Sequence, residues 1–148
     1  MNPTNFCDRC ESANDAAENG HLECLKYAHE NGCRWDERTC AYAAEYGHLV
    51  CLEYAHENGC RWDERTCDSA AANGHLDCLE YAHKNGCLWD KKVCEYAAIN
   101  GHLECLEYVH ANGCDWDTQT CANAAEKATA TQCPFYRGKV ETNVLLDN

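Results

Sequence analysis

The chain of 148 residues carries 25 Asp and Glu against 12 Lys and Arg, which gives a formal net charge of −13 at pH 7. This charge makes nucleic acid and anionic membranes poor partners, and it favours a protein partner that is basic or is not selected by charge. The amino-terminal residues lack the charged and apolar regions of a signal peptide, and no apolar run approaches membrane-spanning length. We therefore expect a reducing, cytoplasmic location, in which the 15 cysteines are core residues or metal ligands and not disulfide partners.

An internal repeat with a period of 27 residues dominates the sequence. A period in this range indicates a stacked array, in which each unit buries its apolar side against its neighbours. We expect an N-terminal cap at 1–12, an array of about four full repeats and a terminal half repeat at 13–127, and a C-terminal tail or cap at 128–148. The markers in strict register are Trp35, Trp62, Trp89 and Trp116, and Gly20, Gly47, Gly74 and Gly101.

Each repeat is predicted to fold as two helices joined by a tight turn. In the unit that begins at Cys33, Asp36 is a good N-cap, and the first helix should extend from there to about residue 46. Gly47 should end this helix in a left-handed conformation, and His48 should open a second helix that ends at Asn58 and Gly59. Nothing in the sequence alternates with period two, so no strand is expected.

The faces of the two helices differ in character. Small residues at i, i+3 and i+4 of the first helix, such as Cys40, Ala43 and Ala44, permit close packing against a neighbouring helix. The second helix is apolar around most of its circumference and leaves one narrow, mostly charged stripe for solvent. This pattern predicts an all-α solenoid of helix-turn-helix repeats.

Residues 38–52 read Arg-Thr-Cys-Ala-Tyr-Ala-Ala-Glu-Tyr-Gly-His-Leu-Val-Cys-Leu, and this segment resembles an ankyrin repeat. The resemblance covers residues from about 11 to 127, with Ala-Ala-x-x-Gly-His and the closing Asn-Gly as its strongest marks. Cys40 replaces the usual Pro and Tyr42 the usual His, and the family's period of about 33 is shortened between Gly59 and Thr66, where the β-hairpin finger belongs. The repeats look like short, Cys-rich ones of giant viruses and some protists. The resemblance implies a finger-less ankyrin-like solenoid that binds proteins and is not an enzyme.

Cysteine and histidine recur as four sets with the spacing Cys-x4-His-x3-Cys-x6-Cys. Three thiolates and an imidazole suit tetrahedral Zn²⁺. The first repeat has Ala13 where later repeats have the third cysteine of the set, and it also lacks a preceding repeat, so we expect that cysteine to face a site at the repeat junction. The predicted ligands of structural zinc are Cys24, His29, Cys33 and Cys40; Cys51, His56, Cys60 and Cys67; Cys78, His83, Cys87 and Cys94; and Cys105, His110, Cys114 and Cys121.

Other interpretations of these residues stay open. Cys51 and His56 lie about 140° apart around a helix, so the fourth ligand could equally be a cysteine of the next repeat or water. The cysteines could instead be small apolar core residues without metal. The histidines of the Gly-His pairs, His21, His48, His75 and His102, are expected to tie backbone between repeats. Cys7 and Cys10 lie outside the register and could cap the array, bind metal together with Cys133, or be exposed thiols.

Comparison of the repeats with one another separates fixed from variable positions. The variable positions lie on the first helices, align along one side of the stack, and include residue types that anchor interfaces. Solvent exposure alone would also permit such variation. The register tryptophans, by contrast, are expected to pack at the repeat junctions. The candidate partner-binding residues are Tyr42, Glu45, Tyr46, Asp68, Asn73, Glu95, Tyr96, Ile99 and Asn100.

These observations favour a protein-interaction scaffold whose partner the sequence does not identify. The alternative is a zinc or thiol buffer, although a buffer needs exchangeable sites and little fold, whereas these helices are carefully capped. A hydrolase is not expected, because catalysis needs one differentiated thiol and every cysteine in the register has near-identical copies.

Overall fold

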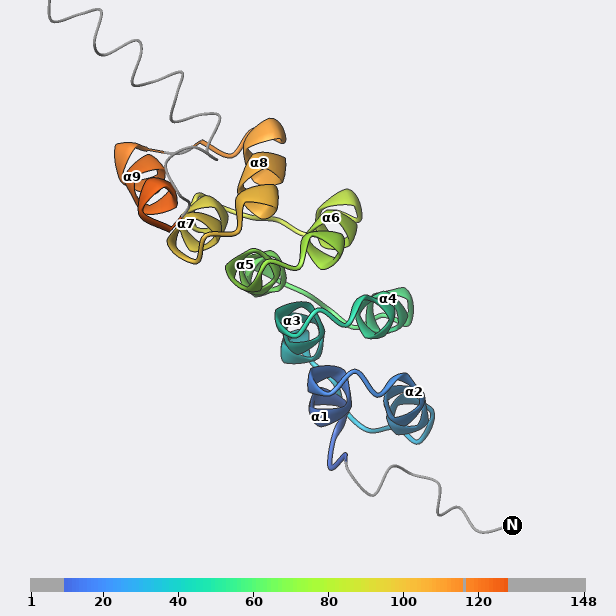
Figure 1. Cartoon of the computed structure of the whole chain (residues 1–148). Helices are drawn as coiled ribbons and strands as arrows, with labels where there is room; N and C mark the ends of the chain where they lie inside the picture. The colour runs from blue at the N-terminus through green and yellow to red at the C-terminus, as the bar shows by residue number, and fades with distance from the viewer. Residues whose placement is uncertain (1–9, 116, 128–148) are drawn as a thin grey trace, which may run out of the picture.

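The computed structural model describes residues 10–115 and 117–127, with only the backbone of Cys121, Ala125 and Lys127 in the last helix (Figure 1). This part of the chain contains α-helices and no strand. The helices are α1 (Ala13–Glu18), α2 (Leu22–Glu30), α3 (Glu37–Glu45), α4 (Leu49–Glu57), α5 (Glu64–Asn73), α6 (Leu76–Lys84), α7 (Lys92–Ile99), α8 (Leu103–Ala111) and α9 (Thr118–Lys127).

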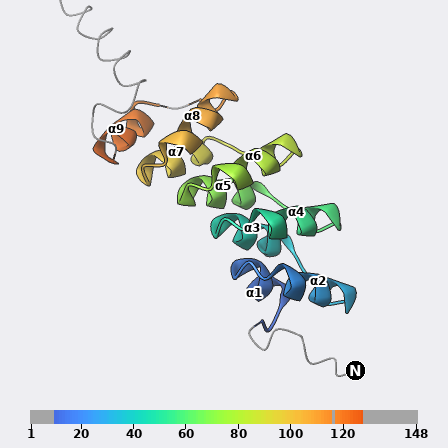
Figure 2. The same ribbon diagram turned by 45° about the vertical axis from the view of Figure 1, so that its right-hand side comes forward.

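The helices form two layers that advance together along the array (Figures 1 and 2). The odd-numbered helices α1 to α9 stack in one layer, and the even-numbered helices α2 to α8 stack in the other. Contacts are most extensive within the odd-numbered layer, because its facing residues are small. The prediction of an all-α, ankyrin-like solenoid without β-hairpin fingers is confirmed for the described residues.

Local sequence determines where each helix begins and ends. Asp36 has an extended backbone, and its side chain accepts a hydrogen bond from Arg38 N, while Thr39 completes a capping box at the start of α3. Gly47 follows α3 with a φ of 76°, and His48 N donates to the carbonyl oxygen of Ala43, which closes the helix end. The predicted helix boundaries in this repeat are therefore confirmed to within one residue.

The core consists of small residues and one leucine per repeat. Leu25, Leu52, Leu79 and Leu106 are buried, and they share one core cluster with most alanines of α1, α3, α5 and α7. The first described helix begins at Ala13 and the last ends at residue 127, while the predicted capping roles of 1–9 and 128–148 fall outside the described residues. Among the described helices, none has the length and apolar character needed to span a membrane.

Candidate interaction surface and thiol clusters

Three histidines of the Gly-His pairs, His48, His75 and His102, pack their repeat against the one before it. His48 Nε2 lies 3.1 Å from the carbonyl oxygen of Glu18, and its ring covers Gly20, where an added Cβ would approach His48 Nδ1 to 2.5 Å. His75 covers Gly47 in the same way. These contacts confirm the predicted structural role of His48 and explain why a side chain is excluded at the glycine.

His29, His56 and His83 of the predicted zinc sets lie in aromatic clusters. His56 stacks on Trp62 with ring centroids 3.6 Å apart, and Tyr81 of the next repeat meets Trp62 edge-on at 6.2 Å. His29 stacks on Trp35 at 4.1 Å, and its Nδ1 lies 3.2 Å from the hydroxyl of Tyr54. Trp35, Trp62 and Trp89 therefore pack at the junctions, as expected, but each meets a histidine before it and a tyrosine after it. Trp116 lies outside the described residues. Burial lowers the pKa of His56, so this imidazole is neutral at pH 7.

Some of the cysteines form thiol pairs between an odd-numbered helix and the loop that follows the next helix. Cys60 Sγ donates a hydrogen bond to the carbonyl oxygen of Asp36 at 3.2 Å, and the Cys40 thiol interacts with the same sulfur. That interaction, together with burial, raises the pKa of Cys40 far above its ordinary value, so Cys40 stays protonated. Cys67 and Cys87 repeat this arrangement.

This pairing differs from the expected one. Cys40 meets Cys60 and Cys67 meets Cys87, each in the loop after the next even-numbered helix, and neither meets a thiol of the preceding repeat. The reason is that this loop returns across the odd-numbered helix, as the hydrogen bond from Cys60 to Asp36 shows. Cys33 lacks such a partner, since Ala13 occupies the equivalent position in α1, and Cys33 is exposed while Cys60 and Cys87 are buried.

The predicted zinc sets are consequently not gathered in the described structure. Their cysteines are divided between thiol pairs of successive repeats, and three of their histidines stack on tryptophan. Within residues 10–115 and 117–127, the residues that bring three ligand atoms within 4.8 Å of one another are Cys10, His21 and Cys24. Cys121 belongs to the fourth set, and its side chain is outside the description. The sets not brought together are Cys24, His29, Cys33 and Cys40; Cys51, His56, Cys60 and Cys67; Cys78, His83, Cys87 and Cys94; and Cys105, His110 and Cys114.

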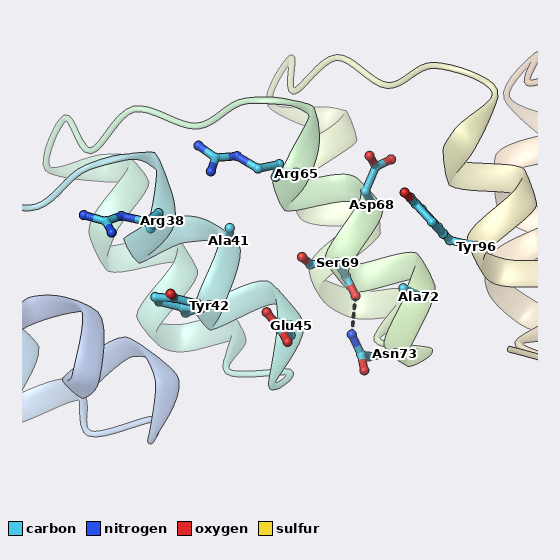
Figure 3. Close-up of a pocket in the computed structure, with 10 residues that line it drawn as sticks. All are labelled: Arg38, Ala41, Tyr42, Glu45, Arg65, Asp68, Ser69, Ala72, Asn73 and Tyr96. Atoms are coloured by element: carbon cyan, nitrogen blue, oxygen red, sulfur yellow. Dashed lines mark hydrogen bonds between the residues drawn. The ribbon is translucent and has the colours of Figure 1, made fainter.

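The variable positions of α3, α5 and α7 line a groove of about 410 Å³ (Figure 3). We call this feature the α3–α5–α7 groove. Tyr46, Ile99 and Asn100 are exposed beyond it, and Glu95 is half-buried. Arg38 and Arg65 also line the groove but were not predicted, because these two successive repeats carry the same residue there. The candidate partner-binding residues that line it are Tyr42, Glu45, Asp68, Asn73 and Tyr96.

Asp68 is the most perturbed carboxylate of the groove. Its side chain is half-buried, and no described donor reaches its Oδ1. At the α1–α3 junction the hydroxyl of Thr39 donates a hydrogen bond to Asn14 Oδ1. At the α5–α7 junction the equivalent of Asn14 is Asp68 and the equivalent of Thr39 is Val93, which has no side-chain donor. Burial, assisted by the charge of Asp90, raises the pKa of Asp68 to about 6, and Lys92 opposes this shift.

Replacement of this carboxylate by an amide should stabilise the array at neutral pH. Because the pKa of Asp68 is raised in the folded state, the contribution of Asp68 to the free energy of unfolding falls as pH rises from about 4 to above 6. Asp68→Asn removes this loss. We expect the free energy of unfolding to increase by about 1 kcal/mol at pH 7.5, a value reduced for the partial exposure of the side chain. The gain should shrink markedly at pH 4.5 in urea unfolding experiments.

Glu107→Gln removes the same formal charge from α8 and serves as the control, with no expected gain at pH 7.5. A stabilisation of Asp68→Asn that is equal at both pH values would show that the carboxylate charge is not its cause.

The stacked helix pairs and the packing of His48 on Gly20 define an ankyrin-repeat fold. Residues 40–83 match the family model described as ankyrin repeats (many copies). Among solved structures, the crystal structure of the human ASB11 ankyrin repeat domain is similar, with a TM-score of 0.73 and 19% sequence identity over 85% of this chain and 67% of that chain. A sequence search of curated proteins gives no match. The chain thus has the ankyrin-repeat fold, with a family match over residues 40–83.

Proposed function

We propose that this protein is a non-enzymatic scaffold that binds a partner protein through the α3–α5–α7 groove. The observation that supports this most directly is the coincidence of two independent features. Most residues that line the groove stand at positions that vary between repeats, whereas the surrounding caps, glycines and aromatic clusters largely keep their residues from repeat to repeat. A recognition surface on a repeat protein requires structural residues that stay the same in each repeat and surface residues that differ on one face.

The chemistry of the groove favours a partner segment with basic and apolar side chains. Tyr42 and Tyr96 offer aromatic area at either end, and Asp68 and Glu45 offer carboxylates between them (Figure 3). The positive charges at the rim are already neutralised within the chain, since Arg65 contacts Asp63 at 2.7 Å and Glu37 at 3.5 Å. The net charge of −13 adds long-range attraction for a basic segment.

Selection from a random peptide library against the full chain at pH 7.5 tests this proposal. We expect enriched peptides to carry Lys or Arg beside an aliphatic or aromatic residue. Tyr96→Ala and Asp68→Asn should each weaken the selected peptides by about tenfold or more, as measured by fluorescence polarisation.

Tyr27→Ala is the matched control for the aromatic substitution, because Tyr27 is an exposed tyrosine on α2, outside the groove. Peptides whose affinity is unchanged by both groove variants, or is equally reduced by Tyr27→Ala, would place binding elsewhere and overturn the proposal.

Two finer features belong to the same proposal. The short period and the density of Cys and His support a place among the short repeats that resemble those of giant viruses and protists. No disulfide forms among the described cysteines, from Cys10 to Cys114, which supports a reducing, cytoplasmic location.

Zinc at every junction, or a zinc and thiol buffer, stays a separate prediction that metal content would test. About four ions per chain would support junction staples. The separation of the thiols into pairs favours the interpretation in which most cysteines are core residues.

A further inference from the structure

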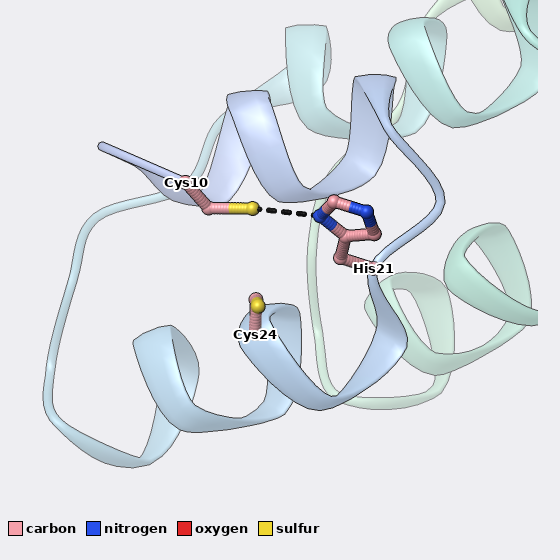
Figure 4. Close-up of side chains that lie close together, drawn as sticks. All are labelled: Cys10, His21 and Cys24. Carbon is pink, nitrogen blue, oxygen red and sulfur yellow. Dashed lines mark hydrogen bonds between the residues drawn. The ribbon is translucent and has the colours of Figure 1, made fainter. Parts of the chain in front are cut away.

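His21, the histidine of the first Gly-His pair, has surroundings unlike those of the equivalent histidines in later repeats. His48 covers Gly20 and meets the carbonyl of Glu18 in the preceding repeat, whereas no described repeat lies ahead of the one that holds His21. The Nδ1 of His21 instead lies 3.0 Å from Cys10 Sγ (Figure 4). The imidazole of His21 thus contacts a thiol, whereas the imidazole of His48 contacts a backbone carbonyl.

A second thiol completes the cluster. Cys24 lies in the first turn of α2, and the ligand atoms of Cys10, His21 and Cys24 all lie within 4.8 Å of one another. Both cysteines are buried, with exposed fractions of 4% for Cys10 and 8% for Cys24, while His21 is half-buried (Figure 4). Three segments contribute, namely the chain before α1, the turn between α1 and α2, and α2 itself.

The separations suit a tetrahedral ion. Bonds of about 2.3 Å from zinc to sulfur and about 2.05 Å to nitrogen place tetrahedral ligand atoms about 3.6 to 3.8 Å apart. The observed range, from 3.0 Å for the Cys10–His21 pair to at most 4.8 Å, brackets that value. Small side-chain rotations would therefore bring all three ligand atoms to bonding distance.

The sequence around the cluster has the spacing of a zinc site. His21 and Cys24 are separated by two residues, and Cys7 precedes Cys10 by the same spacing. Cys7 lies outside the described residues, so the inference depends only on the three groups that the structure places. At the positions equivalent to Cys10 the later repeats carry Glu37, Glu64 and Lys91, so this combination of ligands occurs once in the register.

We propose that Cys10, His21 and Cys24 bind a single structural Zn²⁺ ion that closes the N-terminal end of the array. Two thiolates balance the charge of the ion, and a neutral imidazole supplies the third bond. The ion does at this end what a preceding repeat does elsewhere, because it holds His21 and ties the chain before α1 to α2. The site is distinct from the four predicted junction sets, which it joins only through Cys24.

Metal binding to the full chain, prepared under reducing conditions and stripped with a chelator, tests this site. We expect the wild-type protein to bind about one equivalent of Zn²⁺ and to give Co²⁺ absorption typical of thiolate ligation. Cys10→Ala and Cys24→Ala should each weaken zinc binding by more than about 100-fold, beyond the effect of outer-shell changes. Zinc should also raise the melting temperature of the wild-type chain but not of these variants.

Cys51→Ala is the matched control, because Cys51 occupies the position of Cys24 in the next repeat and is also buried. It should retain zinc binding and the zinc-dependent rise in melting temperature, whatever its own stability. Absence of binding in the wild-type chain, equal loss in Cys51→Ala, or full binding in Cys10→Ala would each overturn the proposal. Binding of about four equivalents that survives Cys24→Ala would assign the metal to the junctions instead.

Discussion

Gly47→Ala is expected to destabilise the array by about 3 kcal/mol. The substitution forces an L-residue into a left-handed conformation with a φ of 76°, which costs about 1 to 2 kcal/mol. The new Cβ would also lie 2.5 Å from Nδ1 of His75, and displacing a packed ring adds about 1 to 3 kcal/mol. Urea unfolding followed by circular dichroism measures the difference.

Gly59→Ala separates the two causes. Gly59 ends α4 with a φ of 84° and the same pattern of closing hydrogen bonds, but nothing lies within 4 Å of its added Cβ. Only the backbone strain should appear there, at about 1 to 2 kcal/mol. If the two variants were equally unstable, the contact between His75 and Gly47 would contribute nothing, and the packing role of the Gly-His histidines would be wrong.

Trp62→Ala is expected to cost about 2 to 3 kcal/mol. Trp62 is partly buried between His56 of α4 and Tyr81 of α6, so truncation opens a gap at the junction and breaks two aromatic contacts. Because each repeat is stabilised by its neighbours, weakening this junction should also broaden the unfolding transition of the array. Chemical denaturation followed by helicity measures both effects.

Leu88→Ala provides the control, since Leu88 is a large apolar residue in a corresponding loop but is 80% exposed. Its truncation should change stability by less than about 0.5 kcal/mol. A double-mutant cycle of Trp62→Ala with His56→Ala should show a coupling of about 0.5 to 1.5 kcal/mol for the stacked pair. Additive losses would indicate that the stacking itself contributes nothing.

Much of the fold could be predicted because its determinants are local and repeated. Asp36 caps the start of α3 and Gly47 allows it to end, and each acts on residues only a few positions away in the chain. The same signals recur with a constant period. The groove was partly predicted for the same reason, since residues such as Asp68 and Tyr96 stand out as variable within a fixed register. Arg65 was missed there because the preceding repeat has the same residue, Arg38, at the equivalent position.

The partners of the cysteines and histidines could not be predicted in the same way. Spacing along the chain placed His56 with Cys60 and Cys67, whereas stacking directs His56 to Trp62 and the returning loop directs Cys60 to Cys40. The cluster at the N-terminal end was missed because Cys10 lies outside the register, so only the folded chain brings it to His21.

The sequence by itself determined the helix pairs, their caps, the period of the stack and the side that varies, because these follow from hydrogen bonds and side-chain sizes over a few residues. Only the tertiary structure decided which thiols meet, which histidines stack on tryptophan, and how burial without a donor raises the pKa of Asp68. Those outcomes depend on the rotation and offset of one repeat on the next, and residue spacing along the chain does not contain that geometry.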